Sequence, residues 1–147
     1  MVFDFLKGKM EIQVNGFNFK PGQTIEGSVN MKLKKMVHAQ GVNIALVGEQ
    51  TVREMRGGKY QQRTVKVFEF KMPLDGEKDY SGEASYPFKI TVPGDILNAA
   101  RRGGIELLGG LVNIGGSSQG YVKWYLSAEL DVKMGFDLDK KIQINIA

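Results

Sequence analysis

Alternation of apolar and polar residues is the feature that most constrains how this chain can fold. In its longest run, from Val122 to Met134, every second residue is apolar and the residues between are mostly polar or charged. Successive side chains of a strand point to opposite faces, so this run describes a strand with one buried and one wet face. Shorter runs of the same kind occupy residues 10–14, 25–33, 42–46, 88–92 and 142–146. The pattern predicts at least six amphipathic strands.

Turn-forming residue pairs separate these segments. They include Asn15-Gly16, Pro21-Gly22, Gly57-Gly58, Asp75-Gly76 and Pro93-Gly94, and such pairs favour tight reversals of the backbone. Short strands joined by tight turns predict an all-β fold, an antiparallel β-sandwich, rather than alternating strands and helices.

One segment departs from the alternation. Between Thr64 and Phe70, Val65 and Val67 share one face, whereas Phe68 and Phe70 take the other. Either a β-bulge between Val67 and Phe68 or a strand covered on both faces explains this change of phase.

Residues 94–119 form the second exception, because they are apolar and rich in glycine. Asp95 to Arg102 can form two helical turns that end at Gly103-Gly104, and Gly-Gly recurs at 109/110 and 115/116. We expect a long apolar loop that either covers an open end of the sandwich or contacts a partner or membrane. Its candidate contact residues are Arg101, Arg102, Ile105, Leu107, Leu108, Leu111, Val112 and Ile114.

Composition removes several classes of function. The chain has 147 residues, the size of one ordinary domain. It has no cysteine, which excludes disulfides, thiolate nucleophiles and cysteine-ligated zinc, and it has one histidine. No run approaches the ~18 apolar residues of a membrane span, and the first residues do not resemble a signal peptide. We therefore expect a cytoplasmic location.

No motif for catalysis or cofactor binding is present in the sequence. His38 has no Gly-x-Ser-x-Gly segment to work with, so a structural role is favoured. The acidic residues from Asp75 to Asp79 lack the glycine and glutamate of a calcium loop, and Gly104 to Gly109 lacks the lysine of a phosphate loop. The sequence thus predicts no catalytic residue, metal site or cofactor, and a hydrolase with two carboxylates is the least favoured alternative.

A basic segment is the strongest candidate for binding. Its residues share a positive charge and have one nearby acid, Glu54; they are Arg53, Arg56, Lys59, Arg63 and Lys66. Two interpretations remain open: an anion-binding loop between two strands, or the solvated end of a hairpin. Nucleic acid is disfavoured, because Tyr60 is the only aromatic residue placed for stacking on a base.

Four segments in order resemble the arrestin-like family. Phe19-Lys-Pro-Gly-Gln-Thr-Ile-Glu-Gly-Ser-Val29 is similar to the family's opening, and Val42-Asn-Ile-Ala-Leu-Val-Gly48 to its next strand. Tyr86-Pro-Phe-Lys-Ile-Thr-Val-Pro93 and Val122-Lys-Trp-Tyr-Leu-Ser-Ala-Glu-Leu-Asp131 resemble later strands. Order and spacing agree across nearly the whole chain.

This resemblance implies one immunoglobulin-like sandwich over residues 1–147, equivalent to an arrestin amino-terminal half. Similar proteins are the α-arrestins, the arrestin-fold retromer subunit and bacterial sporulation-control proteins, which act as adaptors or scaffolds in trafficking and signalling and not as enzymes. Some arrestins bind phosphorylated tails through basic residues on the first strand, where this chain has Lys7 and Lys9. We expect a protein partner, with a peripheral contact to anionic membrane as the alternative. A homodimer through an edge strand is a further expectation.

Overall fold

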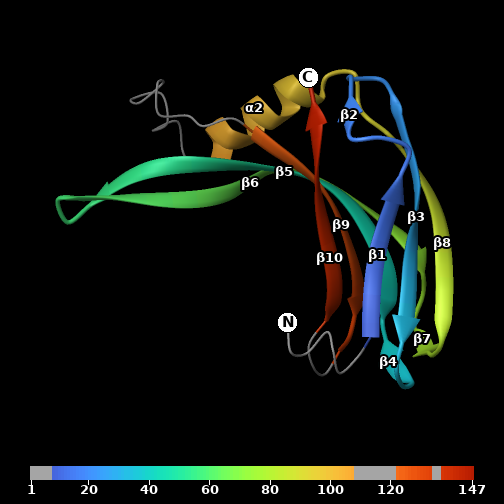
Figure 1. Cartoon of the computed structure of the whole chain (residues 1–147). Coiled ribbons are helices and arrows are strands. Elements are labelled where there is room, and N and C mark those ends of the chain that lie inside the picture. Colours follow the sequence, from blue (N-terminus) through green and yellow to red (C-terminus); the bar gives the residue numbers. More distant parts are fainter. Residues whose placement is uncertain (1–7, 108–121, 134–136) are drawn as a thin grey trace.

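Two β-sheets pack face to face in the computed structural model, which describes residues 8–107, 122–133 and 137–147 (Figure 1). The smaller sheet has the order β1-β3-β8 and comprises Gly8–Val14, Thr24–Leu33 and Glu83–Thr91. The larger sheet has the order β2-β10-β9-β5-β6 and comprises Asn18–Phe19, Leu138–Ile146, Val122–Asp131, Gly41–Arg56 and Lys59–Asp75. β4 (Val37–Ala39) and β7 (Lys78–Tyr80) form a separate two-stranded pair.

The predicted β-sandwich is confirmed, and its pairing is antiparallel with one exception. β2 and β10 pair in parallel over two residues, Asn145 with Asn18 and Ile146 with Phe19. One side of the sandwich is closed where β1 contacts β10. The opposite side ends in β8 on one sheet and β6 on the other.

The core follows the alternation of the sequence. In β9, Trp124, Leu126, Ala128 and Leu130 are buried, and the residues between them are partly exposed. The inward residues of both sheets belong to one apolar cluster, which also contains Ile96 and Ala100 from the helix. Burial of this shared cluster is what holds the two sheets together.

The expected β-bulge is present in β6. Gly48 pairs with Phe68 and Glu49 pairs with Lys66, so Val67 is the extra residue. Val67 and Phe68 both contact the core, and the Phe68 and Trp124 rings pack edge to face at a centroid distance of 5.7 Å. The bulge therefore reconciles two apolar neighbours with a strand that has a single buried face.

The helix is longer than the sequence predicts. α2 spans Ile96–Leu107 and continues through Gly103 and Gly104, which were expected to end it. Glycine costs a helix interior about 1 kcal/mol relative to alanine but does not forbid it. Ile96 and Ala100, one turn apart, are buried in the core, and α2 packs against β6. This contact outweighs the weak propensity of the two glycines.

Candidate functional site

A two-stranded arm projects from the sandwich. β5 pairs with β9 only as far as Gln50, opposite Val122, whereas its pairing with β6 continues to Arg56 opposite Lys59. Residues 51–64, here called the arm, thus extend beyond the larger sheet, and Figure 1 shows them reaching far from the body of the protein. The basic segment, expected as a loop or a solvated hairpin end, is a hairpin formed by two continuous strands.

Glycine permits the tight turn at the tip of the arm. Gly57 and Gly58 have φ values of 58° and 78°, the left-handed geometry of the two-residue turn that matches strand twist. Just before this turn, Met55 lies directly opposite Tyr60. Their exposed fractions are 63% and 71%. The tip therefore presents a cross-strand pair of large apolar side chains to solvent.

The positive charge of the chain is concentrated in the arm. By sequence the arm has four basic residues and one acidic residue, a net charge of +3, whereas the whole chain has +4. The other 133 residues thus contribute +1. A projection with this charge attracts anionic groups more strongly than any average over the surface would suggest.

The remaining predicted basic residues do not join this site. Lys66 lies at the base of the hairpin, where its Nζ is 2.9 Å from a carboxylate oxygen of Glu69. Lys9 lies on β1 of the other sheet, in a shallow hollow of about 450 Å³ that Lys32 and Glu83 also line. Lys7 lies outside the described residues. Of the two first-strand lysines, only Lys9 can be placed, and it lies on a different sheet from the arm.

The candidate apolar loop lies largely beyond the part of the chain that the structure describes. Leu108, Leu111, Val112 and Ile114 fall there, and Ile105 and Leu107 are placed only as backbone of α2. Arg101 and Arg102 are exposed on α2, and the Arg102 guanidinium lies 3.6 Å from the Asp95 carboxylate. Their proposed role in contacting a membrane remains a prediction.

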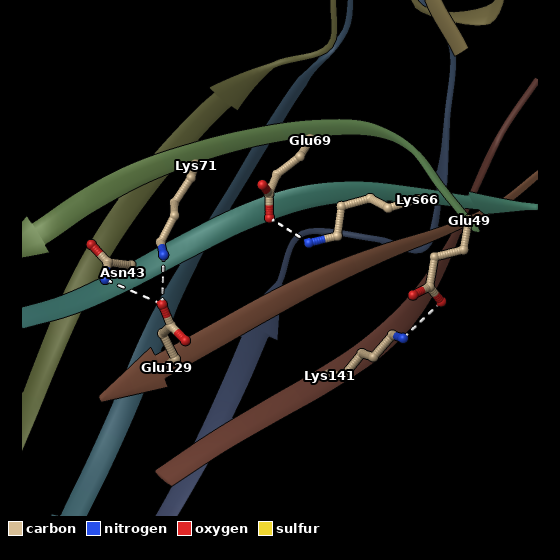
Figure 2. A network of polar contacts seen from close by, with 7 residues as sticks. All are labelled: Asn43, Glu49, Lys66, Glu69, Lys71, Glu129 and Lys141. Atoms are coloured by element: carbon tan, nitrogen blue, oxygen red, sulfur yellow. Dashed lines mark hydrogen bonds and ion pairs between the residues drawn. The ribbon is translucent and has the colours of Figure 1, made fainter. Parts of the chain in front are cut away.

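Ion pairs line the outer face of the larger sheet (Figure 2). Lys71 Nζ lies 2.8 Å from Glu129, and Lys141 Nζ lies 2.8 Å from Glu49. Asn43 Nδ2 donates to the same Glu129 oxygen. The Glu129 carboxylate raises the pKa of Lys71, because it accepts a hydrogen bond from the ammonium group. Every cation named here already has a carboxylate partner, so an anionic ligand would have to displace one.

This face also has a shallow depression of about 260 Å³, lined by the same charged residues and by Ala45, Val47 and Ser127. Ala45 and Val47 are buried although they lie on the outer side of the sheet. The charged side chains cover their apolar surface with their alkyl stems. The network is best explained as a cover for this face.

His38 forms a third polar cluster, at the pair of strands β4 and β7. Its Nδ1 lies 2.8 Å from Asp79, and its Nε2 lies 3.0 Å from Glu77. The hydrogen bond to Asp79 raises the pKa of His38 above 6.5, and the bond to Glu77 adds to this effect. The acidic turn that does not fit a calcium loop thus holds the histidine, and the group is exposed to solvent.

Two other kinds of site are absent from the described ranges. Within them, no group of three or more potential ligand side chains could hold a metal ion. No helix within residues 8–107, 122–133 and 137–147 has both the length and the apolar character needed to cross a membrane.

Sequence reasoning missed Met55 and the apolar pair it forms with Tyr60. The signal was present, because Gly57-Gly58 marks a hairpin turn and fixes which residues lie opposite each other. The outer-face network was also missed, since it joins Asn43 to Glu129, 86 positions away, and Glu49 to Lys141, 92 positions away. No local pattern specifies such a contact.

The two facing sheets and their strand order define an arrestin-like fold, as the sequence resemblance implied. Among solved structures, the chain is similar to Spo0M, a sporulation control protein from Bacillus subtilis, with a TM-score of 0.63 and 15% identity. The match covers 95% of this chain and 49% of the Spo0M chain, so this chain spans about half the length of the structure it matches. No family model and no curated protein matches the sequence.

Proposed function

We propose that this chain is a non-enzymatic protein-binding adaptor or scaffold of arrestin type, acting in the cytoplasm in trafficking or signalling. The arm is its contact site, and its partner presents an acidic surface with an apolar recess. Pairing through an exposed edge strand, with a partner or a second copy, is the second mode of contact.

One observation carries this proposal: the arm exposes Met55 and Tyr60 side by side on a projection of net charge +3. The tip extends past the pairing of β5 with β9, so it is not needed to complete the larger sheet. Tyrosine, methionine and arginine are the residue types enriched at the centres of protein interfaces. An exposed set of these types on a projecting hairpin is therefore best explained by a partner.

Photo-crosslinking tests the proposal directly. Tyr60→p-benzoylphenylalanine in the full chain, expressed in the organism from which it comes, should give discrete cross-linked protein species. Phe17→p-benzoylphenylalanine is the matched control, because Phe17 is also an exposed aromatic residue but lies between β1 and β2. Adding Met55→Ser should reduce the cross-linked yield from position 60.

Adducts of equal yield at positions 60 and 17 would contradict the proposal, and so would the absence of protein adducts at position 60. Urea unfolding of each variant verifies that the sandwich is intact.

Binding to anionic membrane is the second candidate function, because an apolar tip with basic neighbours also suits a headgroup layer. Co-sedimentation with vesicles containing phosphatidylserine, at low and moderate salt, distinguishes the two. If the chain binds a protein and not a membrane, it should stay in the supernatant. Salt-sensitive sedimentation that Arg101→Glu with Arg102→Glu abolishes would favour the helix and the segment after it as the membrane contact. Loss of sedimentation in a variant with both Met55→Ser and Tyr60→Ser would favour the arm as the membrane contact.

A further inference from the structure

The middle of β6 is an open sheet edge. In the described part of the chain, β6 pairs with β5 on one side and is the last strand of its sheet on the other. Phe70, directly opposite the fully buried Leu46, has an exposed fraction of 46%. A large aromatic residue left half-exposed at an unpaired strand edge indicates a site for adding another strand.

The second open edge, β8, is less suited to this role. Pro87 lies in the middle of β8 and pairs with Ser28. Proline has no N–H group to donate, and in edge strands its nitrogen faces the open side. The segment of β6 from Phe68 to Met72 contains no proline. Strand addition is therefore interrupted on β8 and uninterrupted on β6.

This segment of β6 is complementary to itself. In an antiparallel pair centred on Phe70, Glu69 of one chain lies opposite Lys71 of the other, and the reverse also holds. On the opposite face, Phe70 meets its own copy, and Phe68 meets Met72. Opposite charges and apolar pairs directly across an antiparallel ladder both stabilise it. An interface of this kind is isologous, as two-fold symmetry requires.

The charges needed for this pairing are accessible. Glu69 and Lys71 both lie on the outer face of β6, where their side chains are about half-exposed (Figure 2). Among the described residues, each has one ion-pair partner within its own chain, Lys66 for Glu69 and Glu129 for Lys71. A carboxylate has two oxygens and an ammonium group three donors, so a second partner can be added to each.

We propose that β6 pairs with β6 of a second copy, antiparallel and centred on Phe70, to join two larger sheets into one continuous sheet. The contact extends from Phe68 to Met72 and stops before Pro73. α2 also packs against β6 and lies near the base of the arm in Figure 1. This inference specifies the edge for the self-pairing put forward above and is independent of the arm. A monomeric chain would therefore overturn it and leave the adaptor proposal standing.

Charge reversal tests the register as well as the interface. Sedimentation equilibrium of the full chain should give a monomer–dimer equilibrium. Glu69→Lys alone, or Lys71→Glu alone, places like charges opposite each other twice per dimer, and each should weaken dimerisation about tenfold or more. Glu69→Lys combined with Lys71→Glu restores opposite charges across the two-fold axis and should recover most of the affinity.

Phe70→Lys provides a second test, since a charge at an exposed edge blocks strand addition, and it should give a monomer. Lys89→Glu is the matched control, because Lys89 is an exposed lysine on the other open edge, β8, and this variant should dimerise as the parent does. Urea unfolding shows which variants remain folded.

Three results would overturn the inference. A parent chain that is monomeric up to a protein concentration of about 100 µM does not form the proposed dimer. A dimer unaffected by Glu69→Lys and by Phe70→Lys uses another surface. A double variant as weak as the single variants shows that Glu69 and Lys71 do not lie opposite each other.

Discussion

Gly48 illustrates how a single residue determines the packing of the larger sheet. It lies between Phe68 on β6 and Trp124 on β9, on the face that points into the core. A Cβ atom placed on Gly48 would lie 2.8 Å from a ring carbon of Trp124. The indole ring thus occupies the space that any other residue at position 48 would need.

Gly48→Ala should therefore lower the free energy of unfolding by about 1–3 kcal/mol, the usual cost of overpacking a core. Urea denaturation followed by Trp124 fluorescence measures it, because the chain has one tryptophan. Gly16→Ala is the control, since a Cβ there meets nothing within 4 Å. Equal stability of the two variants would show that the ring can move aside at no cost.

At the scale of elements, the packing of α2 depends on one short row of buried apolar residues, Ile96 and Ala100. Ile96 is fully buried and its neighbour Leu97 has an exposed fraction of 45%, so the two residues lie on different faces of the helix. Because α2 contains two glycines and packs against β6, its stability comes from this contact more than from intrinsic propensity.

Ile96→Ala should cost about 2–5 kcal/mol of unfolding free energy, the range for truncating a buried aliphatic side chain. Leu97→Ala should cost far less, because much of that side chain remains in water in the folded protein. Urea denaturation compares the two variants. A similar loss for both would mean that α2 is anchored by a different face.

The strands were predictable to the extent that their signals are local. Alternation locates β9 and β3, and two apolar neighbours at Val67 and Phe68 indicate a bulge. The extent of α2 was not predictable, because Gly103 and Gly104 mark a helix end unless tertiary contacts override them. The arm was anticipated as a basic segment. Its continuous pairing depends on Gly57-Gly58 and on β5, which local charge does not specify.

For the molecule as a whole, the cluster around His38 links stability to pH. The ring joins β4 to the acidic residues on and before β7, and its folded-state pKa is raised above 6.5. Stabilisation by the protonated ring is complete below pH 6.5 and is lost as the pH rises through the folded pKa. His38 is the only histidine, so no second imidazole obscures this dependence.

His38→Gln should remove this pH dependence. The difference in unfolding free energy between the parent and the variant should be largest below pH 6.5 and should shrink as the pH rises. NMR titration of the imidazole should give a midpoint above 6.5, which Asp79→Asn lowers. Glu83→Gln, whose carboxylate pairs with Lys32 and not with His38, should leave the midpoint unchanged. A midpoint at or below 6.5 in the parent would contradict the stabilisation of the protonated His38 ring by the two carboxylates.

The length of the arm also sets how far its tip lies from the sandwich. Six residues of β5 lie beyond its last pair with β9, which at the rise of an extended strand gives a reach of about 20 Å. Anything bound at the tip is held clear of the sandwich by that spacing. Adding or removing two residues on each strand would change the reach and keep Met55 and Tyr60 on the same face. A change of one residue on each strand would turn both side chains to the opposite face. The length of the arm can therefore be changed only in steps of two residues per strand.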